Sequence, residues 1–228
     1  NGFGLDMGEA QDIFEESTML LKRSFTETER WSYTSDRWTF NDIIVEPPVV
    51  QKPYPPMWVG AGSEGSIRDV ARKDYNLLLD QMSPFEAIGE KIRIYQDELD
   101  KLGKDYNPDR VAVTRGLMVA NNDNQRIDAH ILRGKFISEV QVLATDKSKG
   151  PKTFSPVAVS NDTDAISNNG AVLGDKDEMG ERVERLRDEG VHTILLHDLS
   201  GSFEALQQFA EEVMPKFTDD SDRVQAAE

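Results

Sequence analysis

Residues 57–80 read MWVGAGSEGSIRDVARKDYNLLLD, a stretch in which two short apolar runs flank an amphipathic one. The apolar runs cover 57–61 and 75–80, and the amphipathic run covers 66–73. Apolar runs of this length predict strands that are buried on both faces, and the amphipathic run predicts a helix. The stretch therefore predicts a strand–helix–strand unit whose strands are parallel.

The same alternation continues toward the C-terminus. Further strands are predicted at 110–120 and 191–199, and helices at 84–102, 124–144, 176–188 and 203–216. The polar stretch 145–170 predicts a long loop. The fold class is α/β with four strand–helix units. A closed (β/α)₈ barrel has eight strands in typically about 250 residues. We therefore expect either further strands upstream of Asn1 or a partner that covers the exposed sheet edges.

The first 56 residues have a different pattern. A helix is predicted at 8–25 from apolar residues that fall on one side, and alternating aromatic residues at 31–40 predict a short hairpin. The proline-rich run at 46–56 predicts an extended connector, because proline fixes φ and removes an amide donor.

Composition excludes several classes of function. The formal net charge of -16 disfavours nucleic acids and anionic membrane surfaces as partners. The chain has 0 cysteines, which excludes disulfides, thiolate metal sites and a cysteine nucleophile. The histidines lack metal-ligand spacing, so no metal is implied. No apolar run approaches the roughly 20 residues of a membrane span, and no signal peptide pattern is visible, so we expect a cytoplasmic protein.

Five segments, in order along the chain, resemble the bacterial luciferase-like, flavin-dependent monooxygenases. The strongest is PVVQKPYPPMWVG at 48–60, and the others are 3–10, 31–40, 190–196 and 209–217. The resemblance implies a TIM (β/α)₈ barrel of which this chain supplies strands five to eight. Residues 1–228 would then be a single luciferase-like barrel domain that lacks its N-terminal part. The family's substrate-side histidine and its arginine beyond the fourth strand belong to that absent part.

The resemblance also implies a reaction. Reduced FMN and O₂ would oxygenate a small organic substrate, a flavin reductase would supply the reduced flavin, and the protein would form a homodimer. A deazaflavin (F420) oxidoreductase of the same fold is an alternative that the residues do not separate. Two further alternatives stay open: a non-catalytic truncated relative, inactive as this fragment, and a phosphate-binding barrel enzyme of unrelated chemistry.

The turn after the strand at 57–61 is the first candidate site. Its small residues allow a phosphate to approach the backbone, and its hydroxyls and free helix amides suit an anion. By resemblance the flavin phosphate binds here, on Gly60, Ala61, Gly62, Ser63 and Ser66. The alternative is an ordinary turn with a serine N-cap. Glu64 suits a phosphate site only if its side chain points away.

Three other candidates lie on later strands. Gln81 follows Asp80 at the end of the second strand and by resemblance lies near the flavin ring. Arg115 interrupts an apolar strand, so it contacts an anionic substrate or the flavin, or else forms an ion pair. His197 ends the last strand, at the catalytic face of a barrel, where it acts in proton transfer or is a hydrogen-bonded loop residue. Asp175 is interpreted as a helix N-cap.

Overall fold

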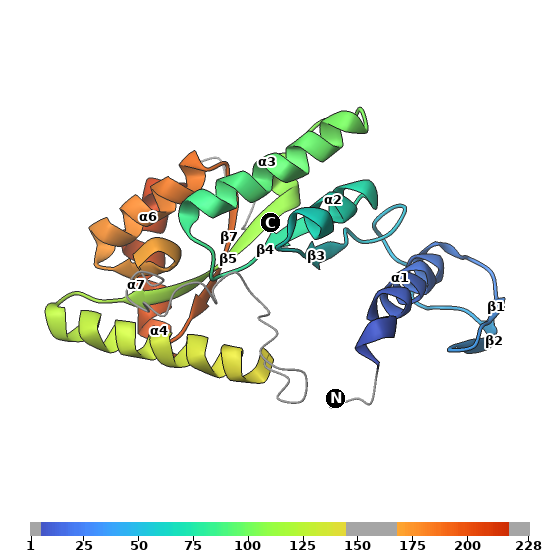
Figure 1. Cartoon of the computed structure of the whole chain (residues 1–228), viewed down its shortest axis with the longest axis horizontal. Helices are drawn as coiled ribbons and strands as arrows, with labels where there is room; N and C mark the ends of the chain where they lie inside the picture. The colour runs from blue at the N-terminus through green and yellow to red at the C-terminus, as the bar shows by residue number, and fades with distance from the viewer. Residues whose placement is uncertain (1–5, 145–167, 219–228) are drawn as a thin grey trace. The chain divides into compact units, whose positions relative to one another are not determined.

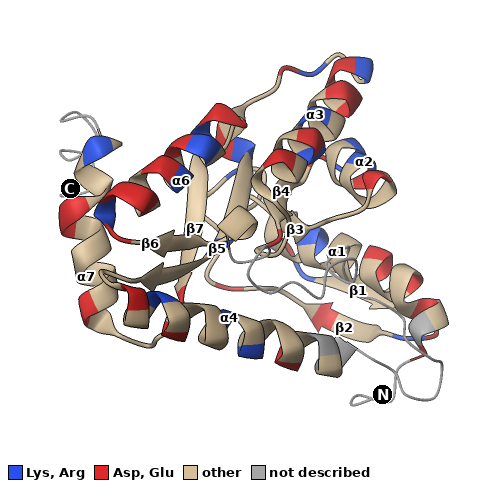
Figure 2. Cartoon of the chain, turned by 60° about the vertical axis from the view of Figure 1, so that its left-hand side comes forward, with Lys and Arg blue, Asp and Glu red and all other residues tan. Residues whose placement is uncertain are grey.

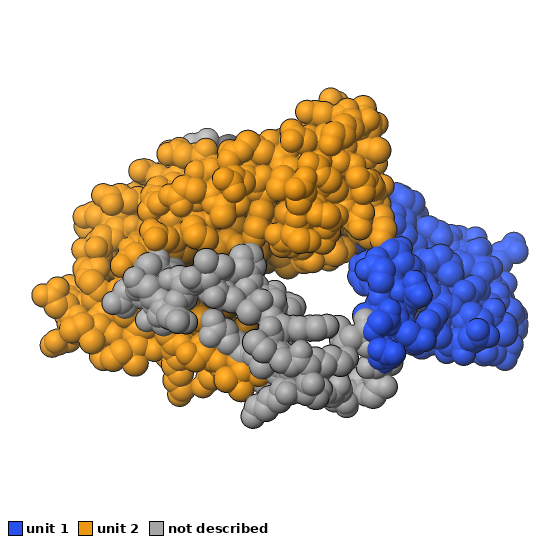
Figure 3. Space-filling model, viewed as in Figure 1, with its two compact units in different colours: residues 1–57 blue, residues 58–228 orange. Residues whose placement is uncertain are grey.

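The structure is a computed structural model, and it describes residues 6–144 and 168–218. The chain divides into two compact units, residues 1–57 and residues 58–228, which Figure 3 colours separately. The expectation that 1–228 forms a single barrel domain stays a prediction.

The first unit is a helix with a two-stranded hairpin. The short 3-10 helix η1 (Met7–Glu9) leads into α1 (Ala10–Thr26), and β1 (Trp31–Thr34) pairs antiparallel with β2 (Thr39–Ile43). Trp31 is buried beneath the Arg23 guanidinium, which lies 4.4 Å from the centre of its ring. The predicted helix and hairpin are both confirmed.

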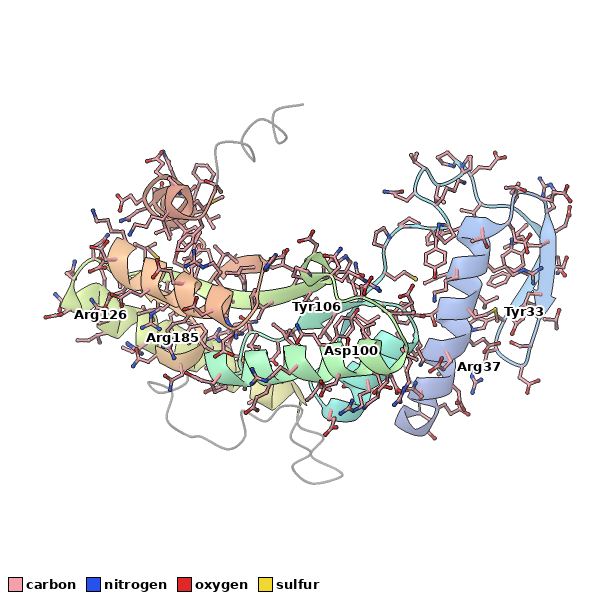
Figure 4. All side chains as sticks on the ribbon, turned by 90° about the horizontal axis from the view of Figure 1, so that it is seen from above. Tyr33, Arg37, Asp100, Tyr106, Arg126 and Arg185 are labelled. Atoms are coloured by element: carbon pink, nitrogen blue, oxygen red, sulfur yellow. The ribbon has the colours of Figure 1, made fainter. Side chains whose placement is uncertain are left out.

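Polar contacts attach this hairpin to α1. The Tyr33 hydroxyl donates a hydrogen bond to Glu16 Oε1 at 2.9 Å, and Arg37 Nη1 lies 3.6 Å from Glu16 Oε2. Figure 4 labels Tyr33 and Arg37 on the hairpin side of α1. One carboxylate thus joins β1 and the hairpin turn to the helix.

The second unit is built on a parallel sheet of five strands (Figure 1). All four pairings are parallel. The strands are β3 (Trp58–Gly60), β4 (Asn76–Leu79), β5 (Val111–Val119), β6 (Val172–Gly174) and β7 (Thr193–Asp198). Within the described residues the sheet runs from β3 to β5 and on to β6 and β7 without closing. Within these residues it is an open segment of a TIM-barrel-type sheet.

The centre of this sheet is β5. Leu117 pairs with both Val172 of β6 and Asp198 of β7. A strand residue pairs with one neighbour on each side, so β6 and β7 lie along opposite edges of β5.

The helices cover both faces of the sheet. In Figures 1 and 2, α3 and α6 lie on one side of β5 and α4 lies on the other. Acidic residues are spread over the exposed sides of the helices in Figure 2, in line with the net charge of -16. The helices are α2 (Glu64–Arg72), α3 (Phe85–Lys101), α4 (Asp123–Ala144), α6 (Lys176–Asp188) and α7 (Phe203–Glu212), with 3-10 turns at Pro108–Arg110 and Met214–Lys216.

One strand was missing from the predicted pattern. The sequence predicts four strands, and the structure adds β6, whose three residues are too few for a periodicity to show. The predicted loop at 145–170 lies mostly outside the described residues, and its last residues, 168–170, are helical. The N-cap prediction for Asp175 is confirmed, since Asp175 Oδ1 accepts from the amides of Asp177 and Glu178.

Candidate functional site

The carboxyl ends of the parallel strands meet at one edge of the sheet. The segments that leave this edge include 61–63 after β3, 80–83 after β4 and 199–202 after β7. Ligand sites of α/β sheets and barrels form at this edge. The predicted site residues other than Arg115 lie on these segments or at their borders, and Arg115 lies in β5, two residues beyond the partner of Leu79.

The turn between β3 and α2 is closed by a capping box. The Ser66 amide donates to Ser63 Oγ at 3.3 Å, and the Ser63 amide donates to Ser66 Oγ at 3.1 Å. Both hydroxyls therefore have a structural role, which agrees with the N-cap alternative. The amides of Glu64 and Gly65 belong to the first turn, whose donors have no acceptor within the helix. The Glu64 carboxylate turns along α2 to pair with Arg68 at 2.7 Å.

Replacing Ser63 with alanine is expected to lower the free energy of unfolding by about 1 kcal/mol, because the helix loses its N-cap acceptor. Urea unfolding measures this loss. Ser138→Ala is the control, because Ser138 is an exposed residue within α4. An equal loss in both variants would show that the capping box contributes nothing specific.

Gly62 lies beside a lysine from α3. A Cβ atom at Gly62 would be 4.0 Å from Lys91 Nζ, with no other atom of the described residues within 4 Å. A Cβ atom at Gly60 would meet no atom of these residues within 4 Å. The backbone of this turn is thus open to an approaching group, and the nearest side-chain atom to Gly62 is a cation.

Asp80 organises the segment that follows β4. Its carboxylate accepts hydrogen bonds from the amides of Met82 and Ser83 at 2.8 and 2.7 Å and from Lys91 Nζ at 2.7 Å. Burial by itself raises the pKa of Asp80, but the hydrogen bond and charge of Lys91, with those from Ser83 and Met82, lower the pKa to about 2. Asp80 is therefore ionised at neutral pH, and through Lys91 it links the end of β4 to Gly62.

Arg115 lies fully buried in β5. Its Nη1 atom donates to the main-chain oxygens of Asp80 at 2.6 Å and Thr114 at 3.1 Å, and its guanidinium carbon is 5.6 Å from the centre of the Phe85 ring. Burial lowers the pKa of Arg115 to about 10, which leaves it charged at neutral pH. Among the described residues its hydrogen bonds go to carbonyl oxygens, and the contact with an anionic substrate or the flavin stays a prediction.

Arg133 of α4 is a second buried arginine, and sequence reasoning missed it. It donates through Nη1 to Gln81 Oε1 at 3.1 Å and through Nη2 to the Gln81 main-chain oxygen at 2.5 Å. A Cβ atom at Gly116 would lie 2.9 Å from Arg133 Nη1, so the glycine makes room for the guanidinium. The helical spacing does indicate that Arg133 is buried, because it falls on the same helical face as Ala129 and Ile137, which are buried.

His197 lies near Arg133, because both side chains pack against Phe136. Its ring packs edge-on against Phe136 of α4 with the ring centres 5.7 Å apart, and the Arg133 guanidinium lies 5.7 Å from the same ring. Asp198 next to it accepts from Ser200 and Ser202 to begin α7. The structure thus brings Gln81 and His197 to one region through Arg133 and Phe136. Their functional roles stay predictions.

Two other kinds of feature are absent from the described residues. In 6–144 and 168–218 no group of three or more His, Cys, Asp or Glu side chains is placed to hold a metal ion. Across the same ranges, no helix combines the length and the apolar character needed to cross a membrane.

The chain resembles solved structures of one fold. It matches monooxygenase RslO1 from Streptomyces bottropensis with a TM-score of 0.73 at 18% identity, covering 95% of this chain and 64% of that one. It matches an F420-dependent secondary alcohol dehydrogenase, solved with an F420-acetone adduct, with a TM-score of 0.69 at 15% identity, covering 94% and 64%. Identities this low show the fold alone.

A third solved structure is the oxygenating constituent of 3,6-diketocamphane monooxygenase from Pseudomonas putida, in complex with FMN. The TM-score is 0.63 at 16% identity, with 91% of this chain and 64% of that chain covered. The chain therefore spans about 64% of the length of each of these structures. No curated protein sequence matches it.

A family model decides the assignment. The model described as luciferase-like monooxygenase matches residues 1–193, which is more than half of the chain. The match includes the hairpin, the proline-rich connector, and the β3 and β4 segments that carry the candidate site. The chain therefore belongs to the luciferase-like monooxygenase family.

Proposed function

We propose that the protein is a flavin-dependent oxidoreductase in which reduced FMN and O₂ oxygenate a small organic substrate. Membership of the luciferase-like monooxygenase family supports an oxidoreductase. The proposal of a flavin cofactor rests on the turn at Gly62. This turn is open at the N-terminus of α2, and the Lys91 ammonium lies beside it.

The residues present fit a flavin phosphate. The backbone at Gly60 and Gly62 leaves the space that a Cβ atom would fill, and the amides of Glu64 and Gly65 have no acceptor within the helix, which favours an anion there. Glu64 pairs with Arg68, so its charge is directed along the helix. In this proposal the turn binds the phosphate, Lys91 supplies positive charge, and Gln81 lies on the ring side. Bound reduced flavin supplies the electrons that activate O₂.

The cofactor F420 is the second candidate. An F420-dependent secondary alcohol dehydrogenase and an FMN-bound monooxygenase both have this fold, so the fold accommodates either cofactor. The two cofactors share a phosphate group, and the turn at Gly62 suits either. Only a direct comparison of binding separates them.

The test is a titration of the full chain with FMN and, separately, with F420, followed by fluorescence. Gly62→Val is expected to weaken binding on the order of tenfold or more, because the side chain occupies the space next to the backbone amides. The same variant should keep its free energy of unfolding within about 0.5 kcal/mol, since the added atoms meet open space.

Asp69→Val is the matched control, because Asp69 lies in the same helix with its side chain 51% exposed and away from the turn. It should bind the cofactor as the wild type does. If Gly62→Val binds FMN and F420 with unchanged affinity, the phosphate is not held at this turn. If the wild type binds neither, the proposed cofactor chemistry is wrong for this chain.

A further inference from the structure

Arg115 has one satisfied edge and one unsatisfied edge. Nη1 is engaged by the carbonyl oxygens of Asp80 and Thr114. Nε and Nη2 are shielded from solvent, and neither has a hydrogen-bond partner in the part of the chain that the structure describes. The residue is 0% exposed. Burying charged donors without an acceptor costs free energy, so a ligand that accepts hydrogen bonds from these two atoms would stabilise the site.

The two unpartnered atoms form one recognition edge. In a planar guanidinium the Nε–H bond and one Nη2–H bond point the same way, side by side. This fork matches the two oxygens of a carboxylate, which accept both hydrogens in a bidentate pair. The free edge of Arg115 therefore supplies both of the donors that one carboxylate needs for a bidentate pair.

The surrounding charge also favours an anion. Asp80 is the carboxylate whose charge acts on both Arg115 and Arg133, and it is already bound by Lys91. Three cationic side chains thus share one carboxylate in this region. The two guanidinium groups repel one another, since the charge of Arg133 disfavours the charged form of Arg115. A second anion between strand and helix would relieve that repulsion.

We propose that the Nε–Nη2 edge of Arg115 binds a carboxylate of the substrate, with Arg133 adding a second positive charge nearby. The substrate class is then a small organic acid. Placing the carboxylate on the substrate rests on the proposed function, whereas the carboxylate site itself does not. Because both donor atoms are shielded, the carboxylate enters a closed space, and side chains packed on the guanidinium, such as Phe85, must move.

The test uses acetate as the probe, at constant ionic strength, on the full chain labelled with ¹⁵N. The Nε–H resonance of Arg115, assigned by its loss in Arg115→Lys, is expected to shift downfield with acetate and to stay in place with neutral acetamide. Arg115→Lys keeps a charge but lacks the fork, so it should bind acetate more weakly, on the order of tenfold. Arg93→Lys is the matched control, because the Arg93 side chain is 62% exposed.

Each outcome decides the proposal. A wild-type Arg115 resonance that acetate leaves unmoved would overturn it, and this reading needs the variant only to assign the resonance. Equal acetate affinity in the wild type and Arg115→Lys would also overturn it. A response to inorganic phosphate without one to acetate would make the edge a phosphate site and overturn the carboxylate assignment. FMN titration of the same samples keeps the two proposals distinct, since loss of FMN binding with an intact acetate response contradicts only the proposed function.

Discussion

Replacing Phe85 with alanine is expected to lower the free energy of unfolding by about 3–5 kcal/mol. Phe85 is 1% exposed at the first position of α3. Two guanidinium groups lie near its ring, with Arg115 at 5.6 Å and Arg185 at 4.6 Å from the ring centre. The substitution removes the aromatic ring from a filled space and takes cation–π contacts from both arginines.

Urea unfolding followed by circular dichroism measures this loss. Figure 4 shows Arg185 on α6 close to α3, and its Nη2 atom lies 2.7 Å from Glu86 Oε1, so the region joins two helices. Phe203→Ala is the control, because Phe203 is also the first residue of a helix but is 74% exposed. It should change stability by less than about 0.5 kcal/mol. A loss below about 1 kcal/mol for Phe85→Ala would show that the ring contributes little to the packing of α3.

Asp80→Asn is expected to destabilise the protein by roughly 2 kcal/mol at neutral pH, which corresponds to the lowering of the Asp80 pKa from 3.8 to about 2. This figure is an upper bound, because the Asp80 side chain is 33% exposed and partly screened by water. Asparagine keeps an oxygen for the amides of Met82 and Ser83 but has no charge for Lys91.

The direction of the Asp80 pKa shift determines how the stability difference changes with pH. The folded pKa is below the unfolded one, so the charge of Asp80 stabilises the fold above pH 3.8, and this contribution is lost as the pH falls toward about 2. The stability difference between wild type and Asp80→Asn should therefore be full at pH 7 and should narrow between about pH 4 and pH 2.

The measurement is urea unfolding of both proteins across this pH range. Asp177→Asn is the control, because its side chain is 72% exposed and its partner among the described residues is a surface lysine, Lys216, at 3.2 Å. It should change stability by less than about 0.5 kcal/mol at every pH. A difference for Asp80→Asn that stays constant from pH 7 to pH 2 would mean that the Asp80 charge is not its source.

Local patterns in the sequence were enough for much of the fold. The runs at 75–80 and 110–120 become β4 and β5 within one residue at each end, because apolar residues fill both faces of these central strands. The alternation at 31–40 becomes the hairpin, and Asp175 becomes an N-cap with Glu178 as its partner. In each case residues near in sequence determine the structure, so a window of a few residues contains the signal.

Features that depend on distant residues could not be read in the same way. β6 forms a strand because Val172 pairs with Leu117, which is far away in the sequence. Arg133 becomes part of the candidate site because Gly116 leaves space above the sheet and Gln81 offers its carbonyl oxygen. A single arginine on a helix face does not reveal such partners. Arg115 was recognised as unusual, but its unsatisfied edge is visible only in three dimensions.

The position of β5 between its neighbours has a consequence for folding kinetics. It is the strand against which β4, β6 and β7 all align, and the partner of Leu117 in β7 is Asp198. The pairing with β7 therefore closes a very long loop and is expected to form late, whereas the β3–β4 pair can form early. In native-state hydrogen exchange, the amides of 112, 113 and 117 should be among the last to exchange, because these residues pair with a strand on each side.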